Sequence, residues 1–234
     1  MVDYQSIYMN RAADYERLIA REDYQGNILR ALQAIRPFEG LDVVELGAGT
    51  GRLTCMLAPL VNSIRAYDIA QPMLAIAEQK LRAMKRDNWQ LVVGDNLALP
   101  ADDDSADVAV AGWSFGHSTA WNESGWRDDI RTAVGHIKRV LRSDGVAIIL
   151  ETMGTGTESP APPSENLAAY YKLLEDELGF AYKWIRTDYQ FESLREAEEL
   201  TRFFFGDELA DQVVANEWII LPECTGIWWF TSAS

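Results

Sequence analysis

The sequence has little cysteine, few basic side chains and no long apolar run. Cys55 and Cys224 are its two cysteines, and neither belongs to a CxxC or Cys/His cluster, so we expect neither a disulfide framework nor a metal site. No stretch reaches the roughly 18 to 20 apolar residues that span a bilayer. The first residues lack the basic and apolar segments of a signal peptide. These absences favour a cytoplasmic protein that binds no metal.

Acidic side chains outnumber basic ones by 36 to 21, which gives a formal net charge of −15. Affinity for DNA and for anionic membranes comes mainly from basic side chains that release counterions, so we expect no nucleic acid and no membrane partner. Most of the surplus lies in residues 151–234, whose net charge is −11. Solvated helices explain such a surplus most simply. The alternative is that part of this segment overhangs a site for a neutral or cationic ligand.

Strand-like and helix-like segments alternate between residues 41 and 150. The β-prone runs are 41–46, 63–67, 89–93, 107–111 and 146–150. Helical spacing of apolar residues predicts helices at 52–60, 72–86 and 128–142. Short links between such segments indicate βαβ units, and therefore an α/β fold in which helices cover both faces of a parallel sheet. Ligands of these sheets bind beyond the carboxyl ends of the strands.

The flanking segments are expected to complete one domain over residues 1–234. Helices are predicted twice within 3–36 and at 166–178 and 194–215, and late strands at 218–221 and 226–230. Glycines and prolines in 152–164 predict a loop, which either caps a substrate pocket or only connects its neighbours. No repeat or linker marks a second domain. We therefore divide the chain into an N-terminal helical cover (1–40), a core (41–150) and a last segment (151–234).

The stretch from Glu45 to Gly51, with the sequence ELGAGTG, is the most informative about function. Its glycines permit a sharp turn from strand to helix and let a ligand lie against bare backbone. Tight turns need glycine in any case. The placement between a predicted strand and a predicted helix nevertheless favours a nucleotide-type site.

Three acidic residues stand at the carboxyl ends of predicted strands, as this loop does. Glu45 precedes the first glycine by two positions, and Asp68 ends the second predicted strand, where a carboxylate can accept both ribose hydroxyls. Asp95 follows the third strand, where it can accept from an adenine amino group. Each acid alone could be a turn residue or a helix cap. Their common placement favours a cofactor that contains a nucleoside.

With these residues the sequence resembles the class I S-adenosylmethionine-dependent methyltransferases, in particular their small-molecule, methyltransferase type 11 branch. The resemblance is strongest over residues 41–150, which it makes the cofactor-binding core, and it places residues 151–234 on the acceptor side. It implies a Rossmann-like sheet of seven strands with one antiparallel late strand. The sequence departs from the commonest family pattern at Glu45, where Asp is usual, and at Ala48, where Cys or Ser often stands.

The resemblance also assigns residues to S-adenosyl-L-methionine. It implies that the glycine loop surrounds the amino acid end, that Asp68 holds the ribose and that Asp95 reads the adenine. An N-terminal aromatic residue is expected to touch the cofactor, although packing against the sheet explains that residue equally well. The cofactor-binding residues implied are Tyr15, Glu45, Gly47, Ala48, Gly49, Gly51, Asp68, Ile69, Met73, Asp95, Asn96, Leu97 and Trp113.

Aromatic side chains alternate after the fourth predicted strand, at Trp113, Phe115 and His117. In an extended stretch they would project to the same side. We expect Trp113 to line the cofactor pocket and His117 to be the candidate catalytic residue, a general base, because imidazole titrates near neutral pH. The alternative is that His117 satisfies only a local hydrogen bond.

Together these expectations describe an enzyme that moves a methyl group to an oxygen, nitrogen or carbon nucleophile of a small, neutral or cationic molecule. The transfer would be an in-line displacement that leaves S-adenosyl-L-homocysteine. Two alternatives stay open. One is a nicotinamide-dependent oxidoreductase on a similar sheet, which the GxGxG spacing disfavours. The other is a protein that binds S-adenosylmethionine without transferring its methyl group.

Overall fold

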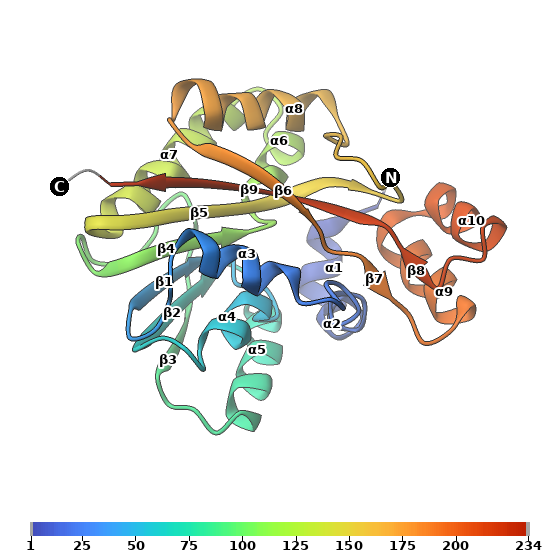
Figure 1. Cartoon of the computed structure of the whole chain (residues 1–234), viewed down its shortest axis with the longest axis horizontal. Coiled ribbons are helices and arrows are strands. Elements are labelled where there is room, and N and C mark those ends of the chain that lie inside the picture. The colour runs from blue at the N-terminus through green and yellow to red at the C-terminus, as the bar shows by residue number, and fades with distance from the viewer. Residues whose placement is uncertain (1, 233–234) are drawn as a thin grey trace.

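Seven strands form one mixed sheet in the computed structural model, which describes residues 2–232 (Figure 1). Their order is β3-β2-β1-β4-β5-β9-β6. The strand β9 runs antiparallel to both β5 and β6, whereas β1 to β5 pair in parallel. The strands are β1 (Asp42–Leu46), β2 (Ser63–Asp68), β3 (Trp89–Val93), β4 (Ala106–Gly112), β5 (Leu141–Thr155), β6 (Ala181–Arg186) and β9 (Glu223–Thr231). The expected seven-stranded sheet with one antiparallel late strand is confirmed.

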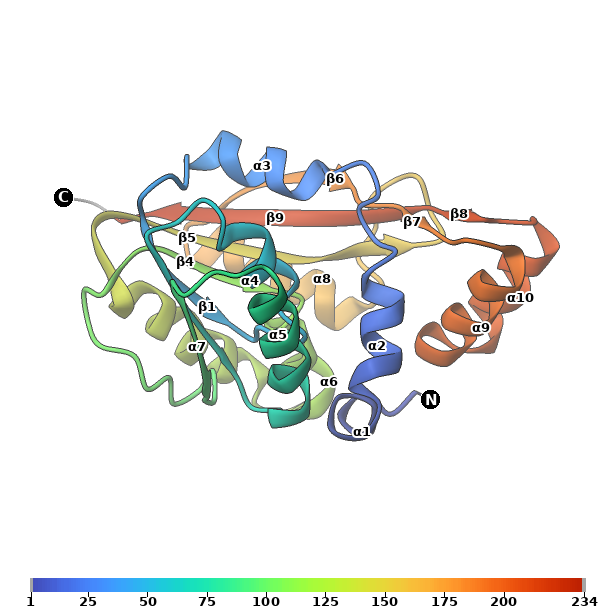
Figure 2. The same ribbon diagram turned by 90° about the horizontal axis from the view of Figure 1, so that it is seen from below.

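Helices cover both faces of this sheet (Figures 1 and 2). On one face lie α3 (Asn27–Ile35), α4 (Arg52–Leu57) and α5 (Gln71–Ala83), and on the other lie α7 (Trp126–Val140) and α8 (Glu165–Lys172), which a π-helical turn, η2 (Leu173–Glu177), extends. Neighbouring residues of β1 show why apolar side chains are needed on both faces of the sheet. Val43 packs toward α3 and α4 while Val44 packs toward α7, and both are buried. The sheet therefore separates two hydrophobic cores.

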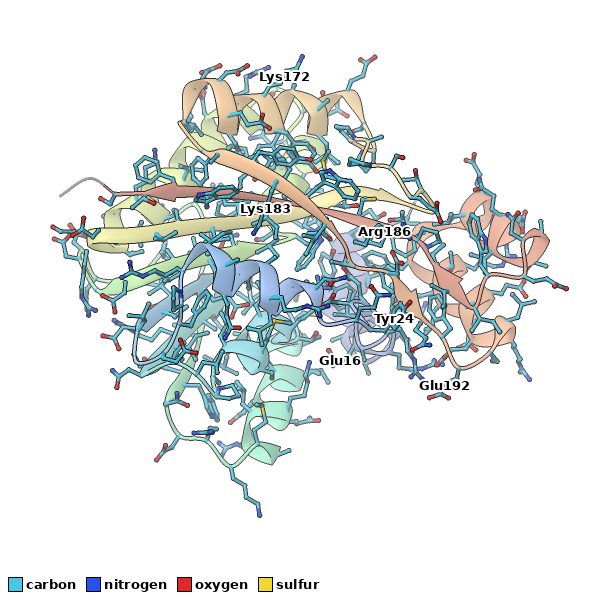
Figure 3. The ribbon with its side chains drawn as sticks, in the orientation of Figure 1. Glu16, Tyr24, Lys172, Lys183, Arg186 and Glu192 are labelled. Carbon is cyan, nitrogen blue, oxygen red and sulfur yellow. The ribbon has the colours of Figure 1, made fainter. Side chains whose placement is uncertain are left out.

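A smaller unit stands beside the sheet, at the right of Figure 1. It consists of α9 (Leu194–Phe205), α10 (Asp207–Ala215) and the two-stranded sheet of β7 (Tyr189–Gln190) and β8 (Ile220–Leu221). Its core includes Leu18 from α2 (Ala12–Ile19). Ion pairs of Arg17 with Glu199 (2.9 Å) and of Arg21 with Glu192 (2.5 Å) join it to the N-terminal segment, and Figure 3 labels Glu192 at this junction.

The N-terminal helices α1 (Tyr4–Asn10) and α2 lie between α5 and α9 (Figure 2). Glu16 of α2 pairs with Lys80 of α5 at 2.6 Å (Figure 3). The cover is therefore tied to the sheet on one side and to the smaller unit on the other. Within residues 2–232, no helix has the length and apolar character needed to cross a membrane.

Several predicted boundaries were wrong. The strand expected at 146–150 runs over 141–155, and the late strand expected at 218–221 is a two-residue strand outside the seven-stranded sheet. Residues 3–36 form three helices, because the chain turns at Arg11 (φ −133°) and again at Asp23, whose carboxylate accepts from the first amides of α3. The expected helix 194–215 breaks at Gly206 into α9 and α10. The expected loop 152–164 begins only after Thr155, because the end of β5 pairs with β9.

Candidate active site

A cavity of about 610 Å³ lies at the carboxyl ends of β1, β2, β3 and β4, and α1 and α2 cover it. This is the size range of pockets that enclose a small ligand. Every site residue predicted from the sequence lines this cavity except Gly51. The structure therefore brings together residues from five segments far apart in the chain.

The glycine loop between β1 and α4 is shaped by close contacts. A Cβ atom on Gly47 would lie 2.0 Å from Ser114 Oγ, and one on Gly51 would lie 2.8 Å from the Cβ of Ala77 on α5. Gly51 thus serves the packing of α4 against α5. A Cβ on Gly49 would meet only the end of Met73, at 3.6 Å, so this part of the loop leaves room in the cavity. In the same loop Thr50 Oγ1 is buried without a hydrogen-bond partner.

Two carboxyl groups flank the loop. Asp68 accepts hydrogen bonds from the backbone N–H groups of Gly49 and Ala70, both at 2.7 Å, one on each oxygen. This fixes the carboxylate and leaves its remaining lone pairs for a ligand, as two neighbouring hydroxyls require. Glu45 is buried and accepts from Thr54 Oγ1 at 2.6 Å, and burial raises its pKa to about 8. A cationic ligand group beside Glu45 would favour its ionised form.

Two apolar side chains of the cavity lining are exposed. Ile69 is 66% exposed and Leu97 is 38% exposed, and both line the cavity. Asp95 lies in the same part of the cavity wall and accepts from the Leu97 N–H at 2.8 Å. Two apolar surfaces and one acceptor suit a flat heterocycle that carries an amino group. The acceptors and apolar surfaces of the cavity thus fit a nucleoside with an amino acid end.

The other half of the cavity is aromatic. Tyr8 Oη lies 3.0 Å from His117 Nε2. The imidazole stacks on the indole of Trp121, and the centres of the two rings are 4.6 Å apart. Burial lowers the pKa of His117 to about 4, so the imidazole is neutral at physiological pH. Burial also raises the pKa of Tyr8 well above its usual value. This pair therefore holds a neutral phenol and a neutral imidazole at the cavity wall.

The stretch that carries Trp113 and His117 is not extended, so the expected alternation was wrong. Trp113 has a φ of 50°, and Phe115 to His117 form a 3₁₀ turn, η1. All three aromatic residues still line the cavity. Glu151, at the end of β5, supports this turn by accepting from the Gly116 N–H at 2.9 Å.

Residues 151–232 are absent from the lining of this cavity, and the expectation that the last segment builds the acceptor side stays a prediction. The loop 156–164 is likewise absent from the lining. The contribution of the segment is indirect. The ring of Phe204 on α9 packs against the rings of Tyr4 and Tyr15, with distances between ring centres of 5.1 Å and 5.4 Å. Phe204 therefore supports the helices that cover the cavity.

Sequence reasoning missed several residues of the cavity lining, among them Tyr8, Arg52 and Trp121. Arg52 is the first residue of α4, and its guanidinium lies 3.5 Å from the centre of the Trp113 ring. Its position directly after Gly51 was the available signal. Nothing local in the sequence distinguishes Tyr8 from the neighbouring tyrosines, or Trp121 from a core residue. Within residues 2–232, no three His, Cys, Asp or Glu side chains form a group that could hold a metal ion.

Known proteins resemble this chain in sequence and in fold. Residues 44–149 match the family model described as a methyltransferase domain. Demethylmenaquinone methyltransferases of Lactococcus lactis and Staphylococcus aureus are each 26% identical over 214 residues, which cover 85% of this chain and 79% and 81% of those relatives.

Two solved structures illustrate the likeness in fold. A SAM-dependent methyltransferase from Aquifex aeolicus has a TM-score of 0.54 and 13% identity, over 97% of this chain and 93% of that one. The YcgJ protein from Bacillus subtilis has a TM-score of 0.57 and 16% identity, over 89% of this chain and 97% of that one. The likeness therefore extends from the glycine loop into the flanking segments.

Proposed function

We propose that this chain, a class I S-adenosylmethionine-dependent methyltransferase, methylates a hydroxyl oxygen or ring carbon of a small, uncharged acceptor with a planar ring. The enzyme class rests on the matched methyltransferase domain and on the relatives. The same findings do not favour a nicotinamide-dependent oxidoreductase. The choice of acceptor rests on the aromatic half of the cavity.

The side chains that line the aromatic half support the choice of an acceptor with an uncharged ring. The aromatic and apolar surface of this half comes from Tyr8, Met9, Phe115, His117 and Trp121, and the polar residues Gln5, Ser118, Asn122 and Asp129 also line the cavity. Stacked aromatic side chains favour flat, apolar ligands. The described lining contains one basic side chain, Arg52, which pairs with Glu22 beside the glycine loop, so a phosphate-bearing acceptor would lack a cationic partner in the aromatic half. The relatives are named for demethylmenaquinone, an uncharged quinone-type molecule.

The other half fits the cofactor. Glu45 would face the ammonium, Asp68 the ribose hydroxyls, and Asp95 the adenine amino group between Ile69 and Leu97. When bound, S-adenosylmethionine supplies a methyl group that its sulfonium has already activated. The remaining tasks of the protein are to align the acceptor and to exclude water.

The Tyr8–His117 pair would take up the proton that a hydroxyl acceptor loses. The 3.0 Å contact lets Tyr8 pass its own proton to Nε2 while the phenol oxygen accepts another. Because the imidazole is neutral, the site can accept a proton at physiological pH. Protonating an imidazole with a pKa of about 4 costs about 3 kcal/mol more than protonating a free one. The pair is therefore a weak base, suited to acceptors that are themselves acidic.

Turnover of a series of phenols and naphthols of falling pKa tests this assignment. His117→Ala should lower kcat about 100-fold for the least acidic acceptor, and the loss should shrink as the acceptor becomes more acidic. Tyr8→Phe should show the same trend with a smaller loss. S-adenosylhomocysteine binding, measured by calorimetry, should stay within about twofold in both variants. Unchanged turnover of His117→Ala at every pH would remove the general base from the proposal.

A further inference from the structure

Arg52 is the basic side chain of the cavity lining within the described part of the chain. It follows the glycine loop directly and begins α4. The acidic residues around the loop, Glu45 and Asp68, cannot bind a carboxylate favourably, because like charges repel. The amino acid end of S-adenosylmethionine carries a carboxylate as well as an ammonium. That carboxylate needs a cationic partner close to the loop.

The guanidinium of Arg52 has donors to spare. It donates one hydrogen bond from Nη1, to Glu22 in the segment between α2 and α3. Among residues 2–232, Nε and Nη2 have no protein acceptor, and neither is among the buried polar atoms that lack a partner. The side chain is 15% exposed. Because Arg52 lines the cavity, a ligand in the cavity can approach a side chain that has unused donors.

Two contacts hold the guanidinium in one orientation. The Trp113 ring lies against its face at 3.5 Å, and the ion pair with Glu22 fixes one edge. Glu22 is itself anchored, because Tyr189 donates its hydroxyl proton to Oε2 at 3.1 Å. An arginine fork that is fixed in this way is well suited to bind a carboxylate with two parallel hydrogen bonds.

A second buried carboxyl group limits the negative charge behind Arg52. Glu223 accepts from Thr152 Oγ1 at 2.9 Å, while its Oε2 and Oε1 of Glu22 are both buried without partners. Burial raises the pKa of Glu223 well above its usual value, and the charge of Glu22 raises it further. Both effects disfavour a negative charge on Glu223, and Glu22 is the carboxyl group that pairs with Arg52.

We infer that Arg52 binds the carboxylate of the cofactor's amino acid end through the donors that Glu22 leaves free. Glu22 and Trp113 are positioning residues in this arrangement. The inference rests on the proposed use of S-adenosylmethionine and adds a cofactor-binding residue to it. It assigns Arg52 to recognition of the amino acid end, and therefore not to recognition of the adenosine.

Two ligands separate these roles in a binding experiment. S-adenosylhomocysteine has the amino acid end, whereas 5′-methylthioadenosine has the same nucleoside and no amino acid. The test variant is Arg52→Gln combined with Glu22→Gln, which leaves no unpaired buried charge. By calorimetry, its Kd for S-adenosylhomocysteine should rise about 10- to 100-fold, because charged hydrogen bonds are lost. Its Kd for 5′-methylthioadenosine should change less than about threefold.

A matched pair controls for the loss of an ion pair elsewhere. Arg142 and Asp107 pair at 3.0 Å near the starts of β5 and β4, at the edge of the sheet opposite the cavity. Arg142→Gln with Asp107→Asn should leave both Kd values unchanged. Arg52→Lys keeps a cation beside Glu22 but loses the planar fork. It should weaken S-adenosylhomocysteine binding selectively even if the double variant does not fold.

Equal weakening of both ligands, in the double variant or in Arg52→Lys, would overturn the inference and leave Arg52 a structural residue. A wild-type protein that binds neither ligand would instead contradict the proposed function. The two failures are therefore distinguishable in the same measurements.

Discussion

Gly47→Ala should distort the cofactor loop in a way that one matched substitution can isolate. Gly47 has a φ of 69°, and a Cβ there would lie 2.0 Å from Ser114 Oγ and 2.4 Å from Ser114 Cβ. Rotation of the serine can move its Oγ. It cannot move its Cβ, which is fixed to the backbone. The loop and the residue after β4 must therefore separate.

The expected magnitude has two parts. An L-residue in the left-handed region costs about 1–2 kcal/mol. Gly26 measures this part alone, since its φ is 68° and a Cβ there would meet nothing within 4 Å. Overpacking adds about 1–3 kcal/mol. With about 2 kcal/mol of overpacking, Gly47→Ala should lower the Tm by about 4–8 °C more than Gly26→Ala does.

Thermal unfolding of both variants, followed by circular dichroism, measures this difference. Ser114→Gly removes both clashing atoms, at the cost of the hydrogen bond from Asn96 Nδ2 (2.8 Å). In a double-mutant cycle, Ser114→Gly should therefore rescue Gly47→Ala. S-adenosylhomocysteine affinity should fall with Gly47→Ala and not with Gly26→Ala. Equal Tm losses for the two alanine variants, or no rescue, would refute the steric reasoning.

Two further predictions concern the carboxyl groups of Asp68 and Glu151. Asp68→Asn should weaken S-adenosylhomocysteine binding about 10- to 100-fold by calorimetry, because an amide nitrogen cannot accept from Gly49 or Ala70, whereas exposed Asp102→Asn should leave binding unchanged. Glu151→Gln should flatten the pH dependence of stability. Burial raises the pKa of Glu151 from 4.5 to about 8, so the stability it contributes is present below pH 4.5 and is lost as the pH rises through 8. The free energy of unfolding, measured in urea between about pH 5 and 9, should show this. If that free energy depended on pH equally in the wild type and in Glu151→Gln, the prediction would be contradicted.

The core of the fold could be predicted because its signals are local. The boundaries of β3 follow directly from the run Trp89 to Val93, and the turn from β1 to α4 follows from the spacing of its glycines. The carboxyl ends of parallel strands meet at one edge, so Asp68 and Asp95 were placed at the cavity without knowledge of any contact. The strand expected at 226–230 lies within β9, where Trp228 is fully buried.

The aromatic half of the cavity could not be predicted because its contacts join distant segments. Tyr8 meets His117 across 109 positions of sequence. Glu22 finds its partners on α4 and β7, and no local pattern marks an acid that will be buried. The prediction that residues 113–117 are extended was wrong for a related reason. Alternation of aromatic residues indicates a strand only where the backbone is extended, and the positive φ of Trp113 ends the strand first.

The position of β9 has a consequence for the order in which the protein is completed. Although β9 is the last strand of the chain, it pairs with β5 and β6 on its two sides. On the ribosome, β5 and β6 emerge well before the strand that must lie between them, so a growing chain carries two unpaired strand edges. Exposed edges of this kind invite pairing with other chains. A chain truncated before β9 should therefore aggregate rather than accumulate as a stable fragment, although it would contain every residue of the cavity lining.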